Sequence, residues 1–282
     1  MIFFNYNGRI FSENDNIIGP TNRGLRYGDG VFETIKFKNG EIILAAQHFE
    51  RLWAGMDALE FTVPIHLTFE KLTAEIKALI KKNKLKEARI RLTVIRSDGG
   101  IFNPKNNTPN YIIEAIKLPE DNGSLNINGL QICIYGDALK SIDKFSSLKN
   151  NNYLPYFMGA KFAKQQQCND ALILNSKGNI CDSTIANIFF IKENIIFTPA
   201  LTEGSVAGVM RNWLINSLKL LDYKVEETTV STGLLYEADE VFLSNSIYNI
   251  RWVSSLENKK YTNIEIQKIN ELLQRKYTEV FC

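Results

Sequence analysis

The sequence predicts an α/β (α+β) protein of two domains, with mixed β-sheets and helices packed on them. Its 282 residues are 45% hydrophobic, enough to bury one large core or two ordinary ones. Segments of alternating apolar and polar residues, typical of half-buried strands, are interleaved with segments of helical periodicity. Residues 119–124, Pro-Glu-Asp-Asn-Gly-Ser, combine a helix breaker with acidic and small residues and lack an apolar anchor. We therefore expect one domain over residues 1–119, a linker over 120–125 and a second domain over 126–282.

Two Asn-Gly pairs predict β-hairpins in the first domain, because Asn-Gly readily supplies the positive φ angles of a tight type I′ turn. They are Asn7-Gly8, between strands expected at 3–6 and 9–11, and Asn39-Gly40, between strands expected at 32–37 and 41–44. Apolar residues at helical spacing and alternating residues predict the elements that follow. We expect helices over 45–59 and 69–82, and strands over 88–96 and 111–116.

The second domain shows the same mixture of signals. The expected strands are 130–135, 171–174, 188–191, 195–198 and 241–243, and the expected helices are 153–167 and 206–221. Ser205 stands where it can cap the open amides of the second of these helices. Thr262 and Glu265 form a capping box that opens the last helix.

Composition narrows the classes of partner and of chemistry. The 33 basic and 31 acidic side chains are nearly balanced and the lysines are scattered, which makes a nucleic acid or an anionic membrane surface an unlikely main partner. No window approaches the roughly 20 apolar residues of a membrane span. The four cysteines, Cys133, Cys168, Cys181 and Cys282, have no C-x-x-C spacing, which fits a reducing cytoplasm. With two histidines, no H-E-x-x-H, no P-loop and no G-x-S-x-G, we expect a small-molecule substrate and no metal.

A phosphorylated cofactor with an aldehyde and a ring nitrogen makes three demands, and the chain offers a candidate for each. Lys149 supplies an amine for the aldehyde, and Asp182 a carboxylate for the ring nitrogen of pyridoxal 5'-phosphate (PLP). Arg51 and the helix start around Gly208 supply a charge and open amides for the phosphate. Each has an ordinary alternative: a surface lysine, an aspartate that starts a turn, a solvated arginine and a plain capped helix.

Five motifs together resemble the class IV aminotransferase family of fold-type IV PLP enzymes. They are Lys149-x-x-Asn152-x-Leu154, the stretch from Asp182 to Ala186-Asn187-Ile188-Phe189, His48-x-x-Arg51-Leu52, Gly28-Asp29-Gly30-Val31-Phe32-Glu33-Thr34 and Gly208-Val209-Met210-Arg211. The resemblance implies that Lys149 forms the Schiff base with the cofactor and acts as the catalytic base. It also implies a homodimer with sites at the subunit interface. The cofactor-binding residues it implies are Arg51, Lys149, Asp182, Asn187, the Val209 and Met210 amides, and Ser246. The family usually has Glu where this chain has Asp182.

Within the family the motifs lean toward aminodeoxychorismate lyase, which releases pyruvate to give 4-aminobenzoate for folate synthesis. The cues are residues 204–211, Leu243-Ser244-Asn245-Ser246-Ile247 and Arg96-x-x-Gly99-Gly100-x-Phe102-x-Pro104. The alternatives are an aminotransferase for branched-chain or D-amino acids and a homologue that binds PLP without catalysis. Arg26, Arg91 and Arg96 are candidates for holding a substrate carboxylate, and their alternative is a solvated charge at the entrance.

Overall fold

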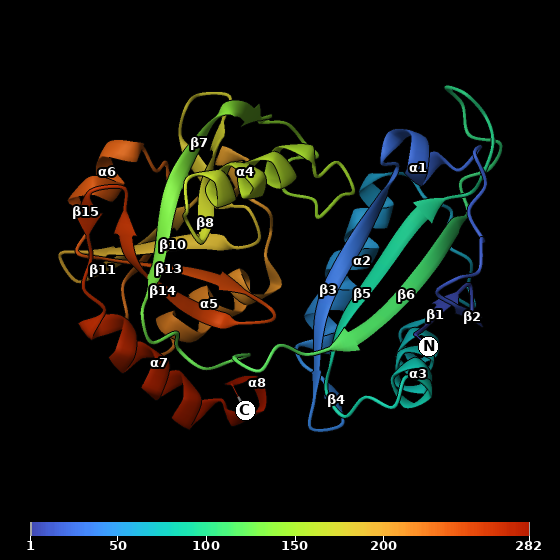
Figure 1. Ribbon diagram of the computed structural model, residues 1–282, viewed down its shortest axis with the longest axis horizontal. Coiled ribbons are helices and arrows are strands. Elements are labelled where there is room, and N and C mark those ends of the chain that lie inside the picture. Colours follow the sequence, from blue (N-terminus) through green and yellow to red (C-terminus); the bar gives the residue numbers. More distant parts are fainter. Residues whose placement is uncertain (1, 282) are drawn as a thin grey trace. The chain divides into compact units, whose positions relative to one another are not determined.

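The computed structural model describes residues 2–281, and Met1 and Cys282 lie outside this range. The chain divides into two compact units (Figure 1). The first comprises the chain up to Glu120 together with Lys149–Asn152, and the second comprises Asp121–Leu148 and the chain from Tyr153 onward. The mixed α/β class predicted from the sequence is confirmed.

The first unit is built on an antiparallel sheet with strand order β2-β1-β6-β5-β3-β4. Its strands are β1 (Phe3–Tyr6), β2 (Arg9–Ser12), β3 (Gly30–Lys38), β4 (Glu41–Ile42), β5 (Ala88–Arg96) and β6 (Pro109–Lys117). Its helices are α1 (Arg23–Tyr27), α2 (Ala45–Ala58) and α3 (Phe69–Lys82). The two Asn-Gly turns have the positive φ angles that the sequence predicts, 50° and 84° at Asn7 and Gly8 and 52° and 84° at Asn39 and Gly40.

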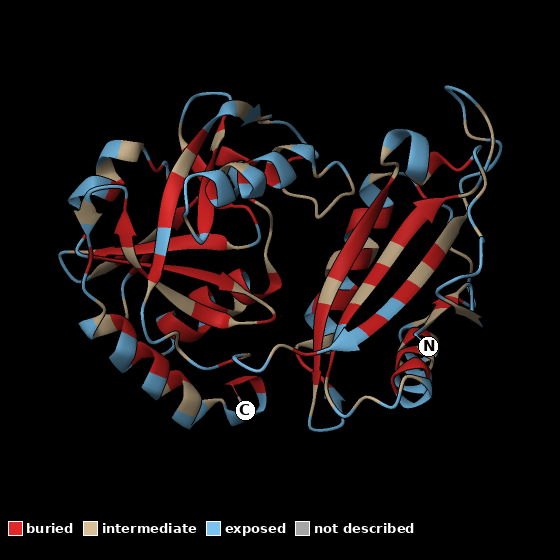
Figure 2. Cartoon of the chain, viewed as in Figure 1, coloured by how far each residue is buried: buried red, intermediate tan, exposed pale blue. Residues whose placement is uncertain are grey.

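Helices α2 and α3 supply the core of this unit. Helix α2 packs against β3, and α3 packs against β1 and β6. Leu52 and Met56 of α2 and Ile76 of α3 are almost completely buried with Ile35 of β3. Figure 2 shows buried bands alternating with half-buried or exposed ones along much of β5 and β6, as expected for strands that bury one face against helices.

The second unit carries a mixed sheet with strand order β12-β11-β10-β13-β14-β7-β8-β9, and β15 pairs with β14. Its strands are β7 (Leu130–Lys140), β8 (Asp170–Asn175), β9 (Ile180–Ser183), β10 (Asn187–Lys192), β11 (Ile195–Pro199), β12 (Val225–Thr228), β13 (Glu240–Asn245), β14 (Asn249–Leu256) and β15 (Lys259–Lys260). Strand β9 also contacts β10 and β11, so the sheet curls back on itself around an apolar core. The helices are α4 (Leu154–Gln165), α5 (Val209–Lys219), α6 (Thr232–Glu237), α7 (Ile264–Lys276) and α8 (Thr278–Phe281), with a 3₁₀ turn, η1, at Leu201–Glu203.

The structure corrects the placement of Lys149, which we expected in the domain over residues 126–282. Lys149–Asn152 belongs to the first unit because it hydrogen-bonds to the start of β3. The Phe32 N–H donates to the carbonyl of Lys149 at 2.9 Å, and the Asn151 N–H donates to the carbonyl of Gly30 at 3.0 Å. The chain crosses between the units at Glu120 and Asp121, inside the stretch that we expected to be a linker.

The expected capping box at the last helix is wrong. Helix α7 has Asn263 as its N-cap, and the cap makes no side-chain hydrogen bond. The carboxylate of Glu240 instead accepts from the N–H groups of Glu265 and Ile266, both at 2.9 Å. A buried acid from β13, distant in sequence, therefore satisfies the first amides of α7.

Within residues 2–281, no helix combines the length and the apolar character needed to cross a membrane.

Replacing Ile76 by alanine should destabilise the first unit, because this side chain is 0% exposed and its removal leaves a cavity. We expect a loss of about 2–5 kcal/mol in the free energy of unfolding, measured by urea denaturation. Ile65→Ala is the matched control, since Ile65 is 97% exposed and should change stability little. Equal effects of the two substitutions would contradict the packing described for α3.

Candidate active site

Lys149 lies on the first unit beside the aromatic ring of Phe32. Its Nζ is 4.5 Å from the ring centroid, a cation–π distance. Asn150 pairs with Val31 as an isolated antiparallel bridge, so the backbone that carries the lysine is ordered by a rigid strand. A Cβ at Gly30 would lie 2.1 Å from the carbonyl oxygen of Val94 and 2.7 Å from Nδ2 of Asn151. Glycine at this position therefore leaves room for both the β5 backbone and the Asn151 side chain.

Arg51 is held by a buried carboxylate that the sequence analysis did not single out. Glu33 of β3 accepts from Nε of Arg51 at 2.7 Å and from Nη2 at 2.5 Å, a bidentate pair. Nδ1 of His48 lies 2.6 Å from the same carboxylate. His48 and Arg51 face Glu33 together because they are three residues apart on α2. Glu33 was contained in the quoted Gly28–Thr34 motif, but its partners lie on another element.

The charge states of this group follow from its surroundings. Burial would raise the pKa of Glu33, but Arg51 and His48 outweigh it and lower the pKa to about 2. Burial lowers the pKa of His48, and the Arg51 and Lys149 charges act in the same direction. A neutral His48 therefore donates from Nδ1 to an ionised Glu33. The stability that Glu33 contributes is present above the carboxyl's unfolded pKa of about 4.5 and is lost as the pH falls toward 2.

The three arginines proposed as substrate ligands differ in their burial and in their contacts. Arg96 is buried and donates to Asp29, Asn107 and the carbonyls of Leu59 and Glu60, which are the contacts of a structural residue. Arg26 is exposed on α1 and donates from Nε to the carbonyl of Pro20 at 2.7 Å. The guanidinium carbon of Arg91 lies 3.9 Å from the centroid of the Phe32 ring. Arg91 is thus the candidate that shares an aromatic neighbour with Lys149.

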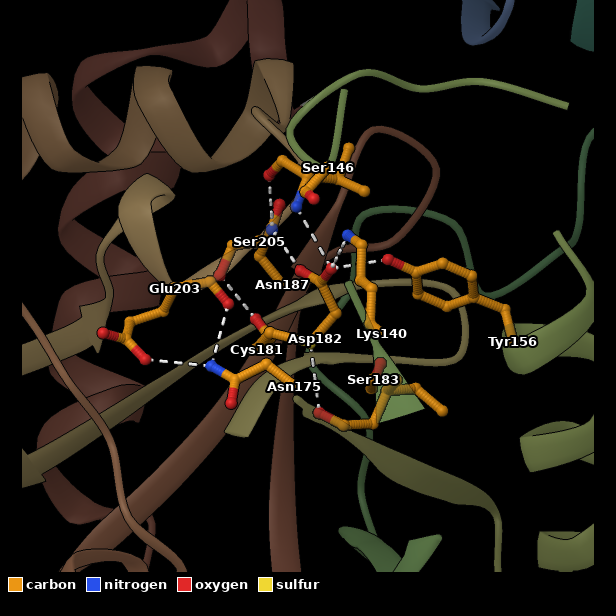
Figure 3. Close-up of polar contacts among 12 residues, drawn as sticks. Lys140, Ser146, Tyr156, Asn175, Cys181, Asp182, Ser183, Asn187, Glu203 and Ser205 are labelled. Carbon is orange, nitrogen blue, oxygen red and sulfur yellow. Dashed lines mark hydrogen bonds and ion pairs between the residues drawn. The ribbon is translucent and has the colours of Figure 1, made fainter. Parts of the chain in front are cut away.

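Asp182 lies in the second unit, inside strand β9, and does not start a turn. It pairs with Ile173 of β8, and its side chain is almost completely buried. Within the described residues it accepts four hydrogen bonds (Figure 3). Nδ2 of Asn187 donates to Oδ1 at 2.8 Å, while Oδ2 accepts from Tyr156 Oη at 2.7 Å, the Val206 N–H at 3.1 Å and Lys140 Nζ at 3.2 Å.

Two side chains close to Asp182, the Tyr156 hydroxyl and the Cys181 thiol, have raised pKa values. Burial raises the pKa of Tyr156 well above its ordinary value, and the neighbouring Asp182 charge raises it further. Burial and the same carboxylate raise the pKa of the Cys181 thiol to about 12. The Tyr156 hydroxyl is therefore a fixed hydrogen-bond donor. Sequence reasoning did not assign Lys140 or Tyr156 to the site, because their partner Asp182 lies 42 and 26 residues away in sequence.

The expected cap of the helix after Gly204 is also wrong, and this matters for anion binding. The Ser205 hydroxyl donates to the carbonyl of Cys181 at 2.7 Å, and the helix begins only at Val209. Its N-cap is Gly208, which has no side chain to bond the first amides. The N-terminus of α5, at Val209 and Met210, therefore has no side-chain cap. Open amides at the positive end of a helix dipole favour the binding of a phosphate.

Asn187 joins this helix start to Asp182. Its Nδ2 donates to Asp182 and, at 2.8 Å, to the carbonyl of Val206. A Cβ at Gly208 would lie 1.9 Å from Oδ1 of Asn187, so the N-cap tolerates only glycine. The structure thus brings Asp182, Asn187 and the start of α5 together.

Ser246 follows β13 in a turn ordered by Asn245. The Asn245 Oδ1 accepts from the N–H groups of Ile247 and Tyr248 at 3.0 and 2.9 Å. Ser244, at the end of β13, keeps a buried hydroxyl that has no hydrogen-bond partner among residues 2–281.

The donors present fit the groups of PLP. The first unit contributes an amine and an anchored guanidinium, Lys149 and Arg51. The second contributes a buried carboxylate and a helix start that only glycine can form, at Asp182 and Gly208. An amine and a guanidinium are groups that suit an aldehyde and a phosphate, and a carboxylate and an open helix start suit a ring nitrogen and a phosphate.

Comparison with known proteins gives the same result. The chain matches the profile of the family described as amino-transferase class IV over residues 30–256. It is 29% identical to the aminodeoxychorismate lyase of Bacillus subtilis, covering 90% of this chain and 87% of that protein. It is 26% identical to the D-alanine aminotransferase of Listeria innocua, covering 89% and 86%. Its fold matches that of the T.th. branched-chain amino acid aminotransferase complexed with N-(5'-phosphopyridoxyl)-L-glutamate, with a TM-score of 0.84 at 20% identity, covering 97% and 93%.

The family match spans most of the chain, and the relatives include both lyases and aminotransferases. The predicted family, enzyme class and PLP cofactor are confirmed. This chain therefore belongs to the class IV aminotransferase family of PLP-dependent enzymes.

Proposed function

We propose that the enzyme is an aminodeoxychorismate lyase, which converts 4-amino-4-deoxychorismate into 4-aminobenzoate and pyruvate. The observation that carries this proposal is the 29% identity to the Bacillus subtilis lyase over 90% of the chain. The lyase-like segments at 204–211 and 243–247 lie at the start of α5 and at the end of β13. Both segments border the groups that we assign to the cofactor.

We assign the binding of PLP to six further side chains and amides besides Lys149. Arg51, the Val209 and Met210 amides and Ser246 would hold the phosphate, and Asp182, positioned by Asn187, would meet the ring nitrogen. Lys149 would join the aldehyde. Bound PLP supplies an electron sink for the substrate carbon that carries the amine.

We assign a separate role to each of three side chains of the protein. We assign the removal of the proton from that substrate carbon to the Lys149 amine, since a positioned lysine amine can act as a general base. Glu33 holds Arg51 in a fixed orientation, so that the phosphate charge meets a preorganised guanidinium. Arg91, which lies over Phe32, is our candidate for a substrate carboxylate. We also propose a homodimer that acts in the cytoplasm.

The second candidate is an aminotransferase for branched-chain or D-amino acids. The Listeria innocua relative favours it, because its 26% identity extends over 89% of this chain. Proton removal by Lys149 is common to both reactions. The two proposals therefore differ only in what the substrate pocket accepts.

Supplying the purified holoenzyme with 4-amino-4-deoxychorismate should release pyruvate, measured with a coupled dehydrogenase. Panels of L- and D-amino acids with 2-oxoglutarate should give no glutamate. Glutamate formation without pyruvate release would replace the lyase by the aminotransferase.

Lys149→Ala should abolish turnover, because the chain then lacks both the covalent link and the base. Borohydride treatment followed by peptide mass spectrometry should place the cofactor on Lys149 in the wild-type protein and on no peptide of the variant. Lys144→Ala, which removes an exposed lysine of the same segment, should keep wild-type turnover. Native rates in Lys149→Ala would refute the assignment.

Glu33→Gln should weaken PLP binding to the apoprotein about tenfold, because a neutral amide cannot hold Arg51 through charged hydrogen bonds. Pyridoxal, which lacks the phosphate, should bind equally to both proteins. Glu50→Gln is the control on the same helix, since Glu50 is exposed. If PLP and pyridoxal were weakened alike, Glu33 would not act through the phosphate site.

A further inference from the structure

The two oxygens of the Asp182 carboxylate accept different numbers of hydrogen bonds. Its Oδ2 accepts from Lys140, Tyr156 and the Val206 N–H, whereas Oδ1 accepts only from Asn187 among the described residues. A carboxylate oxygen offers about two lone-pair directions, so Oδ2 is saturated. Oδ1 is the oxygen with an open acceptor position.

Lys140 is the one charged donor to this carboxylate within residues 2–281. It is the last residue of β7 and pairs with Asn175 of β8, and its carbonyl accepts from the Ser176 N–H at 2.9 Å. Its backbone is therefore fixed at the end of a strand. Its side chain is 11% exposed and reaches Asp182, where Nζ also lies 5.2 Å from the ring centroid of Tyr156. Figure 3 shows the Lys140 amine and the Tyr156 hydroxyl converging on Asp182.

An ammonium and a carboxylate removed from water each need a partner, and removing one leaves the other buried and uncompensated. Asn187, Tyr156 and Val206 contribute hydrogen bonds but no charge. Lys140 thus does two things that the neutral donors cannot. It balances the charge of Asp182, and it holds Oδ2 from the side of β7.

We propose that Lys140 is a positioning residue that holds Oδ2 of Asp182, so that Oδ1 is the oxygen presented to the ring nitrogen of the cofactor. The proposal rests on the role assigned to Asp182 above. Lys140 itself acts through Asp182. Replacing Lys140 should therefore change the affinity for the cofactor and the electronic state of the bound ring, and should leave the fold intact.

The test measures PLP binding to the apoprotein by titration, together with the absorbance spectrum of the bound cofactor. Lys140→Met should weaken binding about tenfold and shift the spectrum, because Asp182 loses its charged hydrogen bond. Lys140→Arg keeps the charge and the donor and should bind PLP more tightly than Lys140→Met. Lys144→Met, which removes an exposed lysine four residues away, should match wild type in both measurements.

The double variant Lys140→Met/Asp182→Asn decides whether Lys140 works through Asp182. If it does, the double variant should bind PLP no more weakly than Asp182→Asn alone, since the partner of Lys140 is already gone. Losses that multiply would overturn the proposal, as would wild-type affinity and spectrum in Lys140→Met. Circular dichroism of the apoproteins checks the fold, and Lys140→Gln replaces Lys140→Met if the methionine variant does not fold.

These measurements do not depend on the reaction catalysed. If pyruvate is not released but the binding pattern holds, the lyase proposal fails and the role of Lys140 stands. If Asp182→Asn itself leaves binding and spectrum unchanged, the role of Asp182 fails and the role of Lys140 fails with it.

Discussion

The candidate site depends first on the attachment of Lys149–Asn152 to the start of β3. The hydrogen bonds between Phe32 and Lys149 and between Gly30 and Asn151 give a loop segment the rigidity of a strand. The amine that we propose for the link to the cofactor gains from such rigidity, since less conformational freedom is lost when it reacts. Gly30 lets both neighbours come close, because a Cβ there would lie 2.7 Å from Nδ2 of Asn151 and would collide with the carbonyl of Val94 on β5.

The chain stabilises its two central carboxylates in different ways. Glu33 is surrounded by a guanidinium and an imidazole, and its pKa falls to about 2 despite burial. Asp182 is held mainly by neutral donors, with Lys140 as its one charged donor within residues 2–281. The first arrangement fixes an arginine through a carboxylate that accepts from Nε and Nη2 of Arg51 and from His48. The second leaves one carboxylate oxygen with spare capacity, as expected for a group that still has to bind something.

Local signals in the sequence predicted local structure well. Both Asn-Gly turns form with the expected φ angles, and the family motifs led to the confirmed family, fold and cofactor. The predictions of helix caps failed where a residue distant in sequence forms the hydrogen bond that we had assigned to a neighbouring residue. Ser205 bonds to Cys181 and does not cap α5, and Glu240 replaces the capping box of α7. Lys140 and Glu33 were overlooked for the same reason, because their partners lie 42 and 18 residues away in sequence.

The membership of Lys149 in the first unit has a consequence for dissecting the molecule. By chain order the lysine lies 28 residues beyond the crossing at Asp121, but by hydrogen bonding it belongs with β3. A gene fragment that starts at Asp121 would encode Lys149 without the strand that orders it. A fragment that ends at Glu120 would encode the strand without the amine. Neither half would carry Lys149 together with the strand that orders it, so a division of the chain that keeps this attachment has to place residues 149–152 on the same piece as β3.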